Sequence, residues 1–149
     1  MFGLFKKKNP EVEKALTNCK IQADSLSRYT NLTLQGKYEA IMLGGFMTMM
    51  YTKFPAGLCK DLMRAIIKEA SNYNVTKSYN DLVDLLNNRM PFYDSVTNDI
   101  KSGKSMALGS IYHILVEEPL TKYPKKSYNL HEILKLQLVI KSFFNSFSR

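Results

Sequence analysis

AIMLGGFMTMMY, residues 40–51, is the longest apolar stretch of the chain without a charged side chain. It reaches only about half of the roughly 20 residues that a membrane-spanning helix requires. Its apolar residues would fall on nearly every side of a helix, which is typical of a helix enclosed by others. The stretch therefore predicts a central apolar helix near residues 34–53. Glycine costs about 1 kcal/mol in a helix interior, so the Gly44-Gly45 pair predicts close packing against a neighbouring helix, or a kink.

On both sides of this stretch, apolar residues recur at spacings of three and four, the pattern of amphipathic helices. Asn9 and Pro10 are typical of a helix N-cap and first helical position, and they predict a helix over residues 10–29. The predicted inner face of this helix is Val12, Leu16, Cys19, Ala23 and Leu26. A third helix follows the break at Phe54-Pro55, and its predicted inner residues are Cys59, Leu62, Met63, Ile66, Ile67, Ala70 and Tyr73.

The second half of the chain contains three more helical patterns. Ser78 opens a capping-box-like sequence, and Pro91 is expected to kink or split the helix that follows near Arg89. The predicted inner residues of that helix are Leu82, Leu85, Leu86, Met90, Tyr93, Val96 and Ile100. A fifth segment, over residues 105–118, has the inner residues Met106, Leu108, Ile111, Tyr112, Leu115 and Val116. Asn129 and Glu132 would cap a last helix, which ends in Leu136, Leu138, Val139, Ile140, Phe143, Phe144 and Phe147.

No segment alternates strictly between apolar and polar residues, and no Asn-Gly turn joins two such segments. The expected fold class is therefore all-α, a single compact bundle of about six helices. A chain of 149 residues has the length of one ordinary domain. We expect a basic N-terminal tail over residues 1–9 and a single helical domain over residues 10–149.

The sequence offers little evidence for catalysis. Gly103-Lys104-Ser105 resembles the end of a phosphate-binding loop, but position 98 is an asparagine and a helical pattern precedes it. His113 lies in an apolar helix and is expected to be a hydrogen-bonded core or boundary residue, and His131 lies in the first turn of the last helix. The two cysteines lie on apolar stripes and are expected to be buried free thiols. We therefore predict no catalytic, cofactor-binding or metal-ligating residues and no enzyme, and an active site assembled only in space is the third alternative.

Charge is distributed unevenly along the chain. The net charge is +8, but the segment from Asp81 to Glu118 carries −3 and the remainder carries +11. If Pro91 bends its helix only mildly, one helix face would carry a set of acidic and hydrogen-bonding residues: Asp81, Asp84, Asn88, Ser95 and Asp99. Such a face could attract a basic partner protein. An ordinary solvated helix surface is the simpler interpretation.

Two groups of basic residues support an alternative function. The first is a helical stripe formed by Lys60, Arg64 and Lys68, and the second is a loop that contains Lys122, Lys125 and Lys126. Basic side chains beside tyrosines could bind the phosphates and stack on the bases of nucleic acid. Residues 2–8 combine short apolar character with three lysines, so they predict at most a weak peripheral membrane contact. In a signal peptide the positive charges precede the apolar core, whereas in residues 2–8 they follow it. The sequence therefore indicates a cytoplasmic protein.

The leading functional hypothesis is a small non-enzymatic helical protein that binds another protein, as an inhibitor, an immunity-type protein or an adaptor. The observations that support it are the compact size, the absence of a catalytic cluster in the sequence and the separation of charge. A nucleic-acid-binding module is the alternative.

Overall fold

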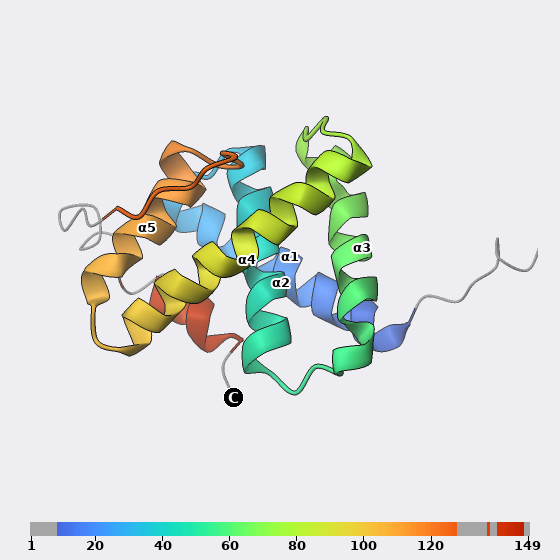
Figure 1. Ribbon diagram of the computed structural model, residues 1–149, viewed down its shortest axis with the longest axis horizontal. Coiled ribbons are helices and arrows are strands. Elements are labelled where there is room, and N and C mark those ends of the chain that lie inside the picture. Colours follow the sequence, from blue (N-terminus) through green and yellow to red (C-terminus); the bar gives the residue numbers. More distant parts are fainter. Residues whose placement is uncertain (1–8, 128–136, 138–139, 148–149) are drawn as a thin grey trace, which may run out of the picture.

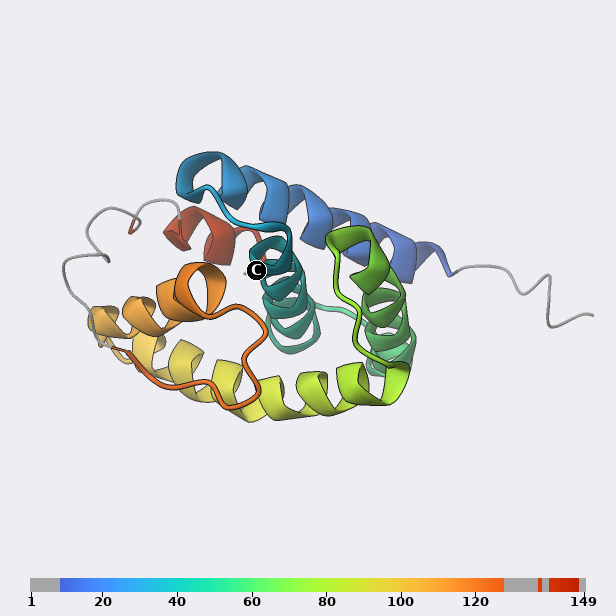
Figure 2. The ribbon, with the colours of Figure 1, turned by 90° about the horizontal axis from the view of Figure 1, so that it is seen from above.

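The computed structural model describes residues 9–127, 137 and 140–147, and these residues form an all-α structure, as the sequence predicts. Helix α2 (Leu34–Tyr51) lies at its centre. Figure 2 shows α1 (Pro10–Thr30) along one side of α2 and α4 (Tyr79–Lys101) along the opposite side. Helix α3 (Cys59–Glu69) closes one end of this arrangement (Figure 1). The central position of α2 explains why it is apolar on nearly every side.

Helix α2 is packed closely against its neighbours at its glycines. A β-carbon on Gly44 would lie 3.0 Å from Phe147 and 3.2 Å from the sulfur of Cys19, and one on Gly45 would lie 2.4 Å from Ile66. The prediction of close packing at this glycine pair is confirmed. Helix α2 is also tied to α3, because the Tyr38 hydroxyl donates a 2.8 Å hydrogen bond to the carbonyl of Ile66.

Helices α1 and α3 follow the sequence pattern closely. Asn9 caps α1 by accepting a 2.8 Å hydrogen bond from the backbone N–H of Glu11, and the whole predicted inner face of α1 is buried. The inner face of α3 is buried at Leu62, Ile66 and Ile67. The prediction that Cys59 is buried is wrong, because Cys59 is the first residue of α3 and is only partly buried. The 3-10 helix η2 (Ala56–Leu58) precedes α3, and η3 (Ala70–Tyr73) follows it.

Helix α4 is continuous through Pro91, so the expected split near Arg89 does not occur. Proline removes the hydrogen bond that residue 91 would donate to the carbonyl of Asn87. Both Asn87 and Pro91 are exposed, and water can therefore satisfy that carbonyl without a break in the helix. Ser78 caps the helix by accepting a hydrogen bond of 3.1 Å from the N–H of Asp81.

The predicted fifth helix is divided into three different helical types. A 3-10 helix, η4 (Ser105–Ala107), leads into α5 (Leu108–Tyr112), and the π-helix η5 (His113–Glu117) follows directly. Met106 is 42% exposed because it lies in the 3-10 turn, so its assignment to the inner face is wrong. Leu108, Ile111 and Leu115 are buried as the sequence predicts, and Ala107 and Ile114 complete the core of this region.

The last described part of the chain contains a basic loop and a short helix. The basic loop, residues 119–127, follows η5 and runs along α4 (Figure 2). The C-terminal segment, residues 140–145, is helical and covers the side of α2 near Gly44. Ile140, Phe143 and Phe147 are buried as the sequence predicts. The predicted N-terminal tail, residues 1–9, lies outside the described residues except for Asn9. The predicted cap at Asn129 lies outside them entirely.

Candidate functional site

The predicted acidic face is present on α4, but the basic loop lies against part of it. Asp81 and Asp84 are exposed near the start of the helix. Farther along, the Asn88 amide donates a 2.7 Å hydrogen bond to the carbonyl of Lys122, and the Lys126 amine lies 3.1 Å from a carboxylate oxygen of Asp99. Lys104 lies 3.9 Å from the same carboxylate. Ser95 is partly buried. Lys104 and Lys126 therefore offset part of the negative charge of this face.

The two predicted basic groups lie on different elements. Lys60, Arg64 and Lys68 are exposed on α3, where Arg64 lies 3.5 Å from Asp61 of the same helix. Lys122, Lys125 and Lys126 lie in the basic loop, which runs away from α3 toward the other end of the molecule (Figure 1). The structure brings the basic loop to the acidic face and does not join it to the stripe on α3.

A buried ion pair connects α2 with α4, and no sequence pattern indicated it. Arg89 donates from Nε and Nη2 to the two carboxylate oxygens of Glu39, at 2.9 and 3.0 Å. Tyr93 also donates to this carboxylate, and the backbone N–H of Leu120 adds a fourth hydrogen bond at 2.9 Å. Neither charged side chain has any solvent-exposed surface. Arg89 Nη1 has no hydrogen-bond partner within the described residues.

Burial and charge shift the pKa values of Arg89 and Tyr93 in this cluster. Burial lowers the pKa of the Arg89 guanidinium, but the hydrogen bonds and charge of Glu39 oppose it, and the net pKa is raised. Burial and the Glu39 charge raise the pKa of Tyr93 well above its usual value. The Arg89 guanidinium therefore stays charged. Its hydrogen bonds to Glu39, together with the one from Leu120, join α2, α4 and the start of the basic loop. Leu120 adopts a left-handed conformation, with φ of 62°, to present its N–H to Glu39.

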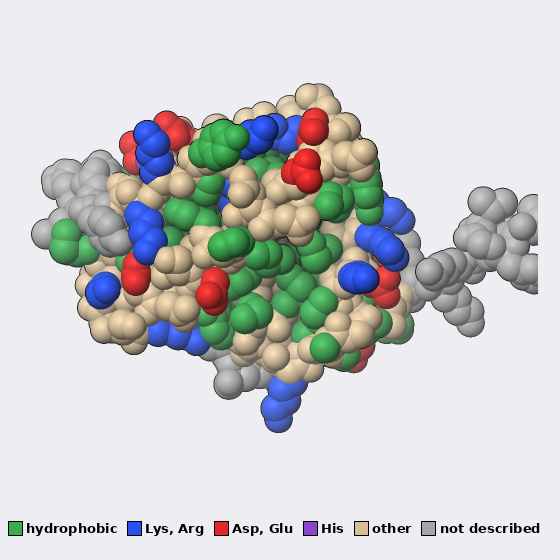
Figure 3. All heavy atoms as spheres, viewed as in Figure 1, with side chains coloured by type: hydrophobic (Ala, Val, Ile, Leu, Met, Phe, Trp, Pro, Cys, Tyr) green, Lys and Arg blue, Asp and Glu red, His purple; other side chains and the backbone are tan. Residues whose placement is uncertain are grey.

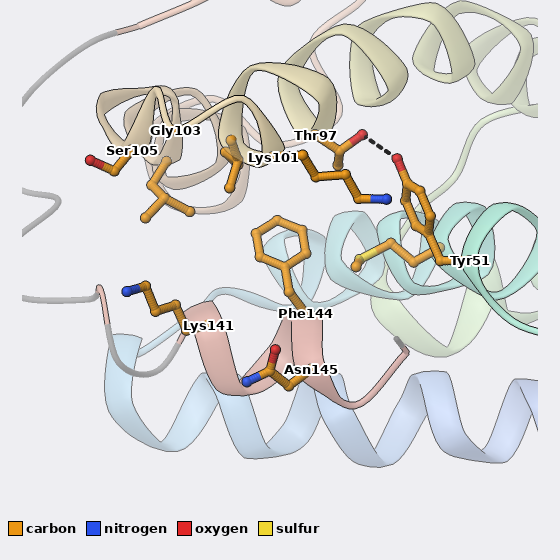
Figure 4. Close-up of a pocket in the computed structure, with 11 residues that line it drawn as sticks. Tyr51, Thr97, Lys101, Gly103, Ser105, Lys141, Phe144 and Asn145 are labelled. Atoms are coloured by element: carbon orange, nitrogen blue, oxygen red, sulfur yellow. Dashed lines mark hydrogen bonds between the residues drawn. The ribbon is translucent and has the colours of Figure 1, made fainter. Parts of the chain in front are cut away.

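The candidate binding site is a pocket of about 440 Å³ between α2, α4 and the C-terminal segment. Apolar side chains from these three elements and from the start of α5 line it: Met47, Tyr51, Ile100, Leu108 and Phe144. Figure 4 shows the Phe144 ring standing in the middle of this space, on the C-terminal segment and facing α4. Volumes of about 300–1,000 Å³ and mostly apolar walls are typical of ligand pockets.

A small number of polar groups surround the apolar part of the pocket. Lys101 comes from α4 and Lys141 from the C-terminal segment, so two cationic side chains stand on opposite walls (Figure 4). The Lys101 amine lies 3.6 Å from the centre of the Tyr51 ring, a cation–π contact. The Tyr51 hydroxyl is held in turn by Thr97 at 2.9 Å. Ser105 and Asn145 complete the polar lining.

Two titratable residues outside this pocket, His113 and Cys19, have local structural contacts. His113 lies 3.2 Å from Glu117 and 3.4 Å from Glu118, which agrees with its expected role as a hydrogen-bonded boundary residue. Burial raises the pKa of the Cys19 thiol to about 12, so this thiol is unreactive near neutral pH. In the part of the chain that the structure describes, no group of histidine, cysteine or acidic residues could hold a metal ion.

Sequence reasoning missed the pocket because its residues are far apart in the chain. Tyr51 and Phe144 were visible only as apolar positions of two separate helices, and Lys101 and Lys141 as isolated surface charges. No local spacing relates them, so only the packing of the C-terminal segment against α2 and α4 reveals the site. Comparison with family models, with curated proteins and with solved structures finds no match to this chain. None of the described helices has the length and apolar character to cross a membrane.

Proposed function

We propose that the protein acts by binding another protein, without catalysis of its own, and that the pocket face makes the contact. The observation that carries this proposal is the pocket itself, an apolar hollow with a lysine on each of two walls. A partner that inserts an apolar side chain there would remove apolar surface from water and form the buried centre of an interface. An inhibitor, an immunity-type protein or an adaptor would work in this way.

Exposed methionines beside the pocket favour a protein partner over a small ligand. Met50 is 55% exposed, and on α2 it lies on the same side as the pocket residue Met47, because residues three apart share a helix face. Met106 is 42% exposed and follows the pocket residue Ser105. Figure 3 shows further hydrophobic side chains gathered beside α4, between α3 and the C-terminal end of α2. Flexible methionines suit surfaces that bind protein segments.

The acidic face of α4 supports protein binding less well than the pocket does. Asn88 and Asp99 already contact the basic loop, so a basic partner would have to compete with Lys122 and Lys126. Only Asp81 and Asp84 are free of such competition from the loop in the described contacts. The basic stripe on α3 carries exposed side chains, and Arg64 already lies 3.5 Å from Asp61 of the same helix, so we propose no nucleic-acid site there.

Photo-cross-linking from the pocket rim tests the proposal. A photoreactive phenylalanine analogue replaces Ser105 in one version of the protein and Ser71 in a control version. Both serines are exposed and lie in 3-10 helices, but only Ser105 lines the pocket. Irradiation in cells of the source organism is expected to give a discrete protein adduct from position 105 and none from position 71.

Nuclease treatment before analysis separates the alternatives. An adduct from position 105 that survives nuclease supports a protein partner. An adduct that nuclease removes, an equal adduct from both positions, or no adduct from position 105 while position 71 gives one would contradict the proposed site. The absence of any adduct in cells that express the protein would contradict the proposed function itself.

A further inference from the structure

From the pocket's two lysines and apolar floor, we infer that the segment it binds is an acidic peptide in which an apolar side chain lies between two carboxylates. This inference rests on the proposed function and names the chemistry of the partner at the same pocket. The apolar side chain would occupy the space above Phe144, and each carboxylate would pair with one lysine.

Charge complementarity is the first argument. Neither Lys101 nor Lys141 forms an ion pair with any of the described residues, although Lys104 and Lys126 both pair with Asp99 nearby. The Lys101 amine is held in place over the Tyr51 ring, and Tyr51 is fixed by its hydrogen bond to Thr97. A lysine whose position is set before binding loses less side-chain entropy when it pairs with a ligand.

The position of the two lysines on opposite walls is the second argument. A fatty acid carries one carboxylate at one end and would leave one of the two lysines without a partner. A peptide with acidic residues on both sides of a large apolar residue supplies two carboxylates around one apolar group. The pocket volume of about 440 Å³ accommodates a few side chains rather than a whole helix. The exposed Met50 and Met106 would then contact the parts of the partner outside the pocket.

Titration of the purified full-length protein with short peptides tests this inference. The probes are three peptides with blocked ends: Glu-Leu-Phe-Glu, its amide counterpart Gln-Leu-Phe-Gln, and Glu-Gly-Gly-Glu. Binding is followed by the NMR shifts of backbone amides at Tyr51, Thr97 and Phe144. Glu-Leu-Phe-Glu is expected to bind roughly two- to thirtyfold more tightly than Gln-Leu-Phe-Gln, the range given by two partly exposed ion pairs. Glu-Gly-Gly-Glu should give no saturable shift.

Matched charge variants locate the effect. The double variant Lys101→Gln with Lys141→Gln is expected to bind both phenylalanine-containing peptides equally. The control Lys60→Gln with Lys68→Gln removes the same charge from the exposed surface of α3 and should bind as the parent protein does. Similar losses in both double variants would show that net charge alone matters, and that result would overturn the inference.

Two further outcomes would overturn it. Equal binding of the glutamate and glutamine peptides would exclude recognition of the carboxylates. Binding of dodecanoate at the same amides, with no shift from Glu-Leu-Phe-Glu, would assign the pocket to a fatty acid. These results are independent of the cross-linking experiment, because a partner could be cross-linked from position 105 even if it carried no acidic residues. Conversely, peptide binding without a cellular adduct would contradict the proposed function alone.

Discussion

Glu39 and Arg89 hold opposite charges together where neither is exposed to solvent. The carboxylate has four hydrogen-bond donors, from Arg89, Tyr93 and Leu120, so its lone pairs are well satisfied. Such a pair contributes little net stability when compared with apolar residues of the same volume, but breaking it leaves an uncompensated buried charge. Its hydrogen bonds connect α2, α4 and the basic loop.

Removing one member of this pair is expected to be far more harmful than removing both. Glu39→Gln keeps the size of the side chain but leaves Arg89 buried without an opposite charge, and it should lower the free energy of unfolding by about 3–5 kcal/mol. The double variant Glu39→Leu with Arg89→Met should be clearly more stable than Glu39→Gln. Urea denaturation measures both. A double variant less stable than Glu39→Gln would show that the hydrogen bonds to Leu120 and Tyr93 matter more than the charge.

Single residues are where the sequence is least informative. Glu39 and Arg89 lie in different helices, and each lies among apolar residues of a helical pattern, where a charge is usually assigned to the surface. Their pairing depends on the distance and rotation between α2 and α4, which the 3.6-residue period does not contain. The same holds for Lys101 and Lys141 at the pocket.

At the level of elements, close contact between α2 and the π-helix η5 depends on a single glycine. A β-carbon on Gly36 would lie 2.5 Å from the carbonyl oxygen of Leu115, a backbone atom that cannot rotate away. Gly57, in η2, has no atom within 4 Å of the corresponding position. These two glycines therefore provide a matched pair, one in close contact and one in open space.

Gly36→Ala is expected to destabilise the protein by roughly 1–3 kcal/mol, the usual cost of overpacking, although alanine favours helix by about 1 kcal/mol over glycine. Gly57→Ala should leave the urea midpoint nearly unchanged. Thermal and urea denaturation of the two variants, measured side by side, provide the comparison. A stabilising effect of Gly36→Ala would mean that helix propensity outweighs packing and that α2 and η5 are farther apart than described.

Elements with a regular period were predictable, and elements that depart from it were not. The inner face of α1 was identified residue by residue because 3.6-residue periodicity continues over the whole helix. Met106 was misplaced because the chain changes from 3-10 to α to π geometry between residues 105 and 117, and each type directs side chains differently. Of the two effects expected of Pro91, a kink or a split, the split does not occur, because the freed carbonyl of Asn87 is on an exposed residue where it can reach water.

At the level of the whole molecule, the described core buries several groups that lose protons at high pH. Burial raises the pKa of Cys19 from 9.0 to about 12, and burial also raises the pKa of Tyr38 and of Tyr93 above the usual value of 10.0. In the unfolded chain these groups lose protons from about pH 9 upward, while in the folded chain they keep them. The unfolded state then binds fewer protons, so the free energy of unfolding should fall as the pH rises.

We therefore expect the urea midpoint to be stable between pH 7 and about pH 8.5 and to fall steadily above about pH 9. Tyr38→Phe provides the control. It loses the hydrogen bond to Ile66 and should be less stable at pH 7 by about 0.5–1.5 kcal/mol, but its stability should fall less steeply above pH 10 because one titrating group is gone. Equal pH slopes for the two proteins would contradict the burial of the Tyr38 hydroxyl.

The central claim concerns the whole molecule: that it works by presenting the pocket between α2, α4 and the C-terminal segment to a partner protein. The most direct test is the affinity of the cross-linked partner, once purified, for two tryptophan variants. Ser105→Trp places an indole at the pocket wall, and Ser71→Trp places one on an exposed turn outside the pocket. We predict that Ser105→Trp weakens binding by at least about tenfold, or 1.4 kcal/mol, while Ser71→Trp binds as the parent protein does. Equal affinity of the two variants would contradict the account.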